Sequence, residues 1–304
     1  MSDAPPEVRA LAERRAAARD ARDFTAADDL RAQLAEAGWT VTDGPTGWRL
    51  EPSDPTSPAR LRAGDVGSAL QEPVAFDATL TWVTEGWPED IDRSLASFRS
   101  TAGDRRLQFV VADVTGERPD RWGTDVEVLP LELGTGWAAA RNAALRRARG
   151  RIVLVVDGSV EATGDALGRL DAALADPSVG VCGPFGLVTE DLREFRRIER
   201  PGACDAVEAY LMAVRRETVI GVGGFDERFE WYRSADLEWS FRVREAGLRV
   251  VMVPAPVTVH EHRAWASTPK EDRESRSRRN YARFLDRWRG RWDLTVRGRP
   301  PDAP

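Results

Sequence analysis

Histidine, cysteine and long hydrophobic runs are scarce in this sequence of 304 residues. The only cysteines are Cys182 and Cys204, and nothing around them resembles a zinc-binding spacing, so we expect free thiols in a reducing compartment. No apolar run approaches the roughly 18 residues of a membrane-spanning helix, and residues 1–10 lack the apolar core of a signal peptide. We therefore expect a cytoplasmic protein, with peripheral attachment to a membrane as the alternative.

The composition is that of a globular protein. Hydrophobic residues make up 42% of the chain and aromatic residues 8%, which excludes wholesale disorder, and the length allows one large domain or two smaller ones. The net charge of −6 is unevenly spread, because residues 263–304 carry 12 basic and 6 acidic side chains. That tail therefore has a charge of +6 and the rest −12. It is either a helix that folds back on the acidic body or a dedicated binding arm.

Two helices and a β-hairpin are predicted near the N-terminus. The first helix covers residues 7–23, and the second begins at Thr25, which forms a capping-box pattern with Asp28. Gly38 ends the second helix, and a hairpin then turns around residues 43–45. This part of the chain is expected to be a small module of its own.

The sequence of this module, RRAAARDARDFTAADDLRAQLAEAGWTVTDGPTGWRL, resembles the C-terminal tail of cysteinyl-tRNA synthetases over about 45 residues. The resemblance implies a scaffold role for residues 1–50, or contact with tRNA or a protein partner. A complete synthetase is excluded, because His260 and His262 are the only histidines and cannot form a HIGH-type signature. Residues 51–73, rich in Pro, Ser, Asp and Gly, are interpreted as a linker.

Strand and helix patterns alternate from about residue 74 to residue 264, which predicts an α/β domain with a mostly parallel sheet. Residues 265–304 are expected to form a basic helix and tail, whose apolar stripe is typical of a packing face. The strands are expected at residues 78–84, 107–113, 126–131, 151–156, 179–183, 209–214, 249–253 and 257–261.

The segment from Gly134 to Asp157 is the most informative in the chain. It predicts a loop, an amphipathic helix and a buried strand that ends on the carboxylate of Asp157, at the sheet edge where α/β proteins bind ligands. One interpretation is a dinucleotide fold, because GTGWAA fits the loose pattern G-x-G-x-x-A and Asp157 lies about 20 residues further on. Trp137 would crowd the tight turn that this fold requires.

A second interpretation rests on more residues. The stretch GWAAARNAALRRARGRIVLVVDGSVE resembles the core of inverting nucleotide-sugar transferases of glycosyltransferase family 2. The later stretch AYLMAVRRETVIGVGGFDERFEWY is similar to the acceptor-side segment of the same family. The resemblance covers residues 76–264 and implies a GT-A fold, with transfer of a sugar from a nucleoside diphosphate to an acceptor hydroxyl.

The resemblance also implies a metal and diphosphate site. Asp157 occupies the first position of the D-x-D region, where it would face the ribose or a divalent cation such as Mn²⁺ or Mg²⁺. Ser159 replaces the usual metal-binding carboxylate and weakens that site. A histidine after a late strand often closes it, and His260 matches this position best, with His262 as a second ligand. The alternative is that both histidines are structural.

Further donor contacts are implied by the same resemblance. Asp113 matches the position that contacts the base or ribose of the nucleotide. Thr84 and Glu85 occupy the first nucleotide-facing loop, although the usual proline and asparagine of that loop are absent. Arg141 is a candidate for the diphosphate, since guanidinium groups suit phosphate, or it ties its helix to a neighbouring loop.

The proton-accepting carboxylate of the family lies at the start of a helix after G-G-F-D-E-x-F. Here Ser234 stands where the base itself usually lies, so Asp236 is the first candidate and Glu238 the second. The alternative is that Asp236 only caps the helix, where the dipole would lower its pKa.

Three classes of function remain open at this point. The first is a glycosyltransferase that uses a nucleotide-sugar donor and an unidentified acceptor. The second is a catalytically degenerate member that still binds a nucleotide sugar. The third is an RNA-associated protein that uses residues 1–50 and the basic tail. The sequence does not specify the sugar, the nucleotide, the acceptor or the oligomeric state.

Overall fold

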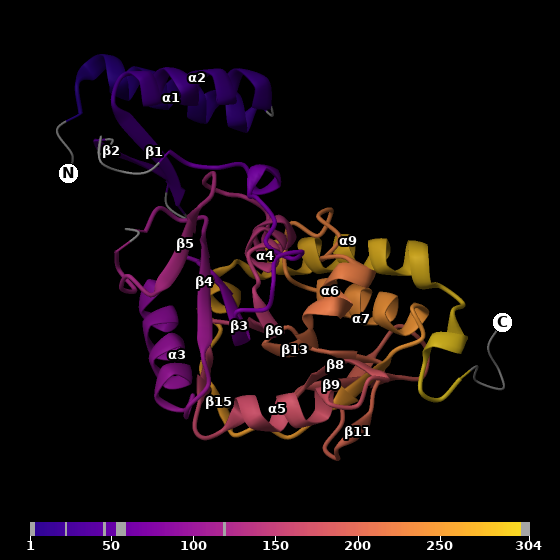
Figure 1. Cartoon of the computed structure of the whole chain (residues 1–304). Coiled ribbons are helices and arrows are strands. Elements are labelled where there is room, and N and C mark those ends of the chain that lie inside the picture. The colour runs from indigo at the N-terminus through magenta and orange to yellow at the C-terminus, as the bar shows by residue number, and fades with distance from the viewer. Residues whose placement is uncertain (1–3, 22, 45–46, 53–58, 118–119, 299–304) are drawn as a thin grey trace. The chain divides into compact units, whose positions relative to one another are not determined.

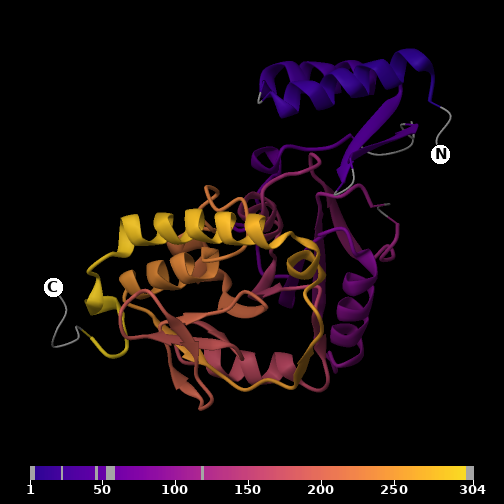
Figure 2. The same cartoon turned by 180° about the vertical axis from the view of Figure 1, so that it is seen from behind.

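The computed structural model describes residues 4–21, 23–44, 47–52, 59–117 and 120–298 (Figures 1 and 2). The chain contacts divide it into two compact units, Met1–Ala59 and Arg60–Pro304. Among the described residues, no helix is long and apolar enough to cross a membrane.

The first unit contains the predicted two helices and hairpin. They are α1 (Pro6–Asp20), α2 (Phe24–Glu36), β1 (Trp39–Gly44) and β2 (Gly47–Pro52), with β1 and β2 antiparallel. Apolar side chains at helical spacing and from both strands share one small core, formed by Ala4, Val8, Ala12, Leu34, Val41 and Leu50.

The predicted capping box of the second helix is wrong. Asp23 is the N-cap, and its carboxylate accepts the Ala26 N–H at 3.0 Å, so Thr25 already lies inside α2. Gly38 follows the helix with a φ of +77°, a left-handed conformation that glycine adopts without steric cost. The predicted turn at Pro45 lies outside the described residues.

The second unit is built on an eight-stranded sheet, and every strand predicted from the sequence is present. Six strands of this sheet run in one direction, whereas β13 and β11 run in the other. The order across the sheet is β11 (Gly202–Ala203), β14 (Arg249–Met252), β8 (Val179–Gly183), β13 (Leu211–Arg215), β6 (Gly150–Val156), β3 (Phe76–Val83), β4 (Leu107–Asp113) and β5 (Val126–Pro130).

Smaller strand pairs complete the domain. The strand predicted at residues 257–261 is β15 (Val257–Val259), which pairs with β7 (Val160–Ala162) outside the main sheet. A three-stranded sheet consists of β10 (Phe195–Arg197), β9 (Gly186–Thr189) and β12 (Ala206–Val207).

Helices cover both faces of the main sheet (Figure 1). On β6, Ile152 and Leu154 point to the face covered by α3 and α5, whereas Val153 and Val155 point to the face covered by α4, α6 and α7. The helices are α3 (Pro88–Ser100), α4 (Trp137–Arg146), α5 (Ala166–Leu174), α6 (Arg216–Val222), α7 (Ala235–Glu245), α8 (Arg263–Ser267) and α9 (Lys270–Trp288), with short 3-10 turns η1 (Ala63–Asp65) and η2 (Trp292–Leu294).

The second half of the predicted linker packs on the second unit. Leu61 bridges Leu131 beside β5, and Ala63 and Val66 are buried in the cluster that also contains residues of β4 and α4. Contacts with the sheet edge therefore begin at Arg60, and the boundary between the two compact units falls inside the segment interpreted as linker.

The basic C-terminal helix folds back on the acidic body. Figure 2 shows α9 lying along α7. The predicted apolar stripe of α9 packs there, with Phe284 and Trp288 fully buried against Phe241. Arg287 and Arg291 both pair with Glu245 at the end of α7. These contacts favour the packing interpretation of the stripe and of the charge.

Candidate active site

Three ionisable side chains meet at the carboxyl edge of the main sheet. Asp157 follows β6 and Glu85 follows β3, and these two strands are parallel neighbours, so their carboxyl ends lie together. His262, just before α8, places its Nε2 atom 3.2 Å from Asp157 Oδ2 and 3.5 Å from Glu85 Oε2. One ligand atom from each residue lies within 4.8 Å of the others.

Hydrogen bonds set the charge of this cluster. The His262 Nδ1 atom accepts the Trp265 N–H at 3.1 Å, which places the ring proton on Nε2, facing Asp157. Burial would raise the pKa of Asp157, but hydrogen bonds from His262 and Ser159 outweigh it and lower the pKa. Burial, and then the charge of Asp157, raises the pKa of Glu85 to about 7.

These residues fit a divalent cation. Two carboxylates and an imidazole are ligands that Mn²⁺ accepts, and the negative charge of buried Asp157 and half-buried Glu85 is one that a cation would neutralise. A cation here would displace the Nε2 proton of His262. Ser159 brings no negative charge to this site, and its hydroxyl donates to Asp157 Oδ1 at 2.5 Å.

His262, rather than His260, is the histidine beside Asp157. His260 Nε2 instead pairs with Glu161 at 2.6 Å, and its ring is 39% exposed. The family resemblance favours His260 because it ends the apolar run of residues 257–259, and both histidines would share one face only if the strand continued through them. The strand ends at Val259, and His262 then caps α8, so alternation along a strand no longer decides which way its ring points.

Arg141 ties the helix to the sheet. It is 1% exposed and its Nη1 atom donates to the carbonyls of Thr81 and Val156, both at 2.9 Å. Its neighbour Asn142 exchanges two hydrogen bonds with the backbone of Phe225. The structural alternative for Arg141 therefore agrees with its contacts better than a role at the diphosphate.

Asp113 and Thr84 are engaged within the protein. Asp113 is fully buried and accepts hydrogen bonds from Thr84 Oγ1, from the turn at Thr115 and Gly116, and from Arg60 Nη2 at 3.0 Å. Arg60 covers the carboxylate that the family resemblance assigns to the nucleotide. Contact between Asp113 and a base or ribose would require Arg60 to move.

The N-terminus of α4 does not form a dinucleotide-binding turn. The N–H groups of Trp137 and Ala138 have no acceptor inside the helix, and they donate to the carbonyls of Glu230 and Phe229 at 2.8 and 3.3 Å. A Cβ atom at Gly136 would lie 3.2 Å from Glu230 Cα, so the glycine permits close approach of this loop. The place where a pyrophosphate would bind is filled by the protein's own backbone.

A cavity of about 390 Å³ lies next to the ionisable cluster. Asp157 and His262 line it together with Asp236 from the first turn of α7. Its other walls come from the start of α4, the β9–β10 hairpin, the segment before β13, the segment before α7, α7 itself and α9. They are formed by Trp137, Leu187, Arg193, Phe195, Glu208, Ala209, Tyr210, Tyr232, Arg233, Ser234, Leu237, Ser277, Arg278 and Tyr281.

Asp236 is not the cap of α7. The N-cap is Ser234, in a left-handed conformation with a φ of +65°, and Asp236 accepts N–H groups from Ala209 at 3.2 Å and Leu237 at 2.9 Å. Burial, and then the charge of Glu208, raises the pKa of Asp236 to about 6. The expected lowering by the helix dipole is wrong, because desolvation outweighs it.

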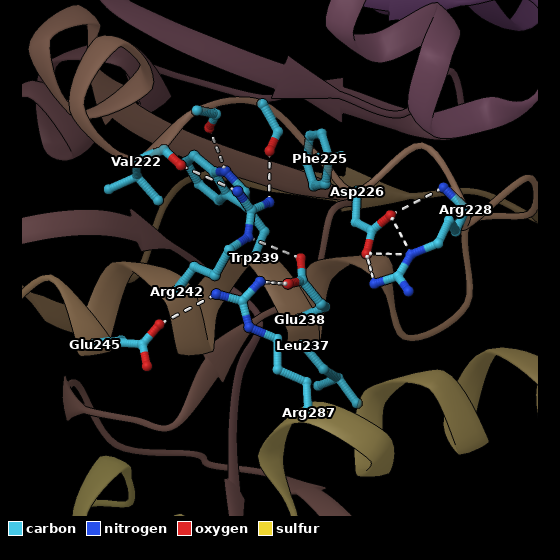
Figure 3. Close-up of polar contacts among 12 residues, drawn as sticks. Val222, Phe225, Asp226, Arg228, Leu237, Glu238, Trp239, Arg242, Glu245 and Arg287 are labelled. Carbon is cyan, nitrogen blue, oxygen red and sulfur yellow. Dashed lines mark hydrogen bonds and ion pairs between the residues drawn. The ribbon is translucent and has the colours of Figure 1, made fainter.

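Glu238, the second candidate base, is engaged in ion pairs within the protein. It is 2% exposed and pairs with Arg242 at 3.0 Å and with Arg287 of α9 at 3.2 Å (Figure 3). It does not line the cavity. Two arginines hold its carboxylate at the α7–α9 interface, which removes it from the candidates for proton transfer.

Sequence reasoning missed several side chains of the cavity. Tyr210 and Tyr232 both contact the His262 ring, with centroid distances of 5.9 and 4.8 Å. Arg193 and Arg278 come from a hairpin and from the C-terminal helix. Both tyrosines lie inside residues 209–232, the stretch that resembles the family's acceptor-side segment, and this resemblance is the one signal that could have identified them.

Two family models match separate parts of the chain. Residues 111–238 match the family model Glycosyl transferase family 2. Residues 1–49 match the model Cysteinyl-tRNA ligase anticodon binding domain. Both resemblances predicted from the sequence are therefore confirmed.

Two curated relatives differ in how much of the chain they match. A cysteine–tRNA ligase of Opitutus terrae is 50% identical over 52 residues, which is 17% of this chain and 11% of the ligase. The protein y4gI of Sinorhizobium fredii is 26% identical over 266 residues, covering 71% of this chain and 29% of its own length. The chain thus spans less than a third of either relative.

A solved structure supports the fold. GalNAc-T7, crystallised with UDP, GalNAc and Mn²⁺, superposes with a TM-score of 0.60 at 17% identity, over 72% of this chain and 49% of its own. At this identity the likeness concerns the fold alone. The predicted GT-A fold is confirmed.

Proposed function

We propose that the second unit is a glycosyltransferase that moves a sugar, with inversion, from a nucleoside diphosphate to an acceptor hydroxyl. The family match over residues 111–238 supports this assignment. The observation that carries it is that Asp157, His262 and Asp236 line one cavity. Inverting transfer needs charge stabilisation at the leaving group and a base at the attacking hydroxyl, and this cavity offers both.

The donor end is formed by Asp157, Glu85 and His262. They would hold a divalent cation, Mn²⁺ or Mg²⁺, which when bound would neutralise charge on the departing diphosphate. His262 is fixed for this task by Tyr210, Tyr232 and its contact with the Trp265 N–H. GalNAc-T7, which shares the fold, was crystallised with UDP and Mn²⁺.

The acceptor end is formed by Asp236. A hydroxyl has a pKa far above 7 and needs a carboxylate to take its proton as it attacks the sugar. Backbone N–H groups of Ala209 and Leu237 fix the orientation of Asp236. Its pKa of about 6 makes it a stronger base than an ordinary aspartate, while leaving it mostly ionised above neutral pH.

A thermal-shift screen of UDP-, GDP- and dTDP-sugars, with and without Mn²⁺, tests the proposal. A ligand that binds the native state raises the melting temperature by mass action. We expect one nucleotide class to stabilise the protein in a Mn²⁺-dependent manner, and Asp157→Asn to lose this effect. His260→Ala is the matched control, because His260 lies outside the cation cluster. Binding without any turnover would favour the degenerate alternative, for which the covered Asp113 is the specific observation.

We propose a second function for the first unit, contact with tRNA. The support is the match of residues 1–49 to an anticodon-binding domain and the 50% identity to a ligase over 52 residues. A gel-shift titration with total tRNA at rising salt tests it. Binding should weaken as the salt concentration rises, because the release of counterions from the RNA then contributes less to the affinity. Deletion of residues 1–50 should abolish the binding. An unchanged shift after that deletion would refute the assignment.

A further inference from the structure

We propose that the acceptor carries a phosphate monoester, held by Arg193, Arg233 and Arg278 in the cavity that contains Asp236. This inference rests on the proposed function, since it names the class of molecule that presents the hydroxyl. The three arginines come from the β9–β10 hairpin, the residue before Ser234 and α9. Segments far apart in the sequence therefore each contribute an exposed arginine to the lining of one cavity, and the Arg233 guanidinium lies over the Trp265 ring at 5.3 Å.

The charges of the cavity are paired unequally. Each of its acids has donors within the protein: Asp157 has His262 and Ser159, Asp236 has two backbone N–H groups, and Glu208 has Arg197. Arg193 and Arg233, in contrast, make no ion pair with any residue that the structure describes. Arg278 makes one, an exposed contact with Glu274 at 3.6 Å. The charged groups of the cavity that have the fewest partners are thus its arginines.

A hydroxyl group adds to this capacity. The Tyr232 Oη atom is buried and has no hydrogen-bond partner among the described residues, and Tyr232 lines the same cavity. A buried donor without a partner is costly unless a ligand satisfies it. An oxyanion bound by the arginines would offer it an acceptor oxygen.

The positive surface continues beyond the cavity. Ser277 and Arg278 also line a second hollow of about 380 Å³, next to Trp265, where Lys270 and Arg273 face a single acid, Glu274. Trp265 stacks on Trp231 and lies beneath Arg273 at 4.8 Å. An acceptor larger than one sugar would find a further anion-attracting wall along α9.

The arginines are separate from the donor end. The small hollow on the other side of Asp157, lined by Glu85, Trp87, Ser159 and His262, contains none of the three. Their position beside Asp236 associates them with the attacking molecule. Three guanidinium groups also exceed what one carboxylate can neutralise, whereas a phosphate monoester has close to two charges and accepts several charge-assisted hydrogen bonds.

Calorimetric titration of the full chain with glucose 6-phosphate, glucose and inorganic phosphate tests the proposal. We expect glucose 6-phosphate and phosphate to bind and glucose not to bind. Arg193→Gln, Arg233→Gln and Arg278→Gln should each weaken phosphate binding about tenfold or more. The matched control is Arg279→Gln, which removes the same charge from the next position of α9 but does not line either hollow.

The affinity of the arginine variants for the nucleotide that the donor screen identifies distinguishes an acceptor site from a donor site. Unchanged nucleotide affinity in the arginine variants supports an acceptor site, whereas loss of that affinity would assign the arginines to the donor and overturn the proposal. Equal phosphate affinity in the Arg278 and Arg279 variants would also overturn it. Arginine-dependent phosphate binding in a protein that binds no nucleotide would leave a phosphate site but refute its role in transfer.

One further experiment determines whether the phosphate belongs to a lipid or to a soluble sugar. Co-sedimentation with phosphatidylcholine vesicles, with and without phosphatidic acid, compares a lipid phosphate with the soluble sugar phosphate. Arginine-dependent binding to phosphatidic acid alone identifies a lipid-borne acceptor, and binding of glucose 6-phosphate alone identifies a soluble one. Absence of arginine-dependent binding in both arms rejects the phosphate chemistry.

Discussion

Replacement of Asp236 by asparagine should separate catalysis from stability. Burial, and then the charge of Glu208, raises the pKa of this carboxyl from 3.8 to about 6. The folded chain therefore binds its proton more tightly than the unfolded chain does. Between these two pH values the contribution of Asp236 to stability falls as pH rises, because the native state must give up the proton that it favours.

The size of this effect follows from the two pKa values. By the linkage relation, the raised pKa of Asp236 lowers the free energy of unfolding by about 1.6 kcal/mol at pH 5 and by about 3 kcal/mol at pH 8. Asparagine does not titrate, so the variant should gain about 1.4 kcal/mol relative to the parent between pH 5 and pH 8. Its single acceptor oxygen loses one of the two N–H bonds from Ala209 and Leu237, about 1 kcal/mol at both pH values.

Urea unfolding of both proteins at pH 5 and pH 8 measures the stability difference. Initial rates of sugar transfer measure catalysis, which Asp236→Asn should reduce by about 10²- to 10⁴-fold while nucleotide binding persists. The parent's rate should also fall as pH drops below about 6, where the carboxylate is protonated. Asp286→Asn, on the exposed face of α9, is the control. A stability difference independent of pH, or transfer within a few-fold of the parent, would refute the reasoning.

Three further changes test other parts of the structure. Glu238→Ala should destabilise the fold by about 3 kcal/mol in calorimetric melting, because it leaves Arg242, whose side chain is 14% exposed, without its carboxylate partner. The specific activity of the folded fraction should be unchanged, and its loss would contradict this assignment. His262→Ala should weaken Mn²⁺ binding in a metal titration, whereas His260→Ala should not, and the reverse order would restore the original ligand assignment. Gly150→Ala should cost about 1–3 kcal/mol in chemical denaturation, because its Cβ would lie 2.3 Å from a backbone nitrogen of β3, and a neutral result would contradict that packing.

The main strands and the position of Asp157 could be predicted from the sequence. A continuous apolar run that ends on a carboxylate indicates a buried strand and its carboxyl end, and both properties are local. The family resemblance then indicated which loops should meet there. Glu85 and Asp157 do meet, because the strands before them are parallel neighbours.

The contacts that engage Asp113 and Glu238 within the protein come from residues that are distant in the sequence. Arg60 reaches Asp113 across 53 positions, and Arg287 reaches Glu238 across 49, so neither carboxylate shows its partner in its own motif. The choice between His260 and His262 depended on where a three-residue strand ended. The arginines of the cavity come from segments without a motif, and only the fold brings them together.

Release of nucleotide from a nucleotide sugar, measured with Mn²⁺ for the parent and for Asp157→Asn, tests the central claim most directly. The account predicts that the parent releases nucleotide from one donor class in a metal-dependent reaction. It also predicts that Asp157→Asn, which keeps the shape of the side chain but removes its charge, lowers the rate by about 10²-fold or more. Absence of nucleotide release from every donor, or an equal rate in the variant, would contradict the account.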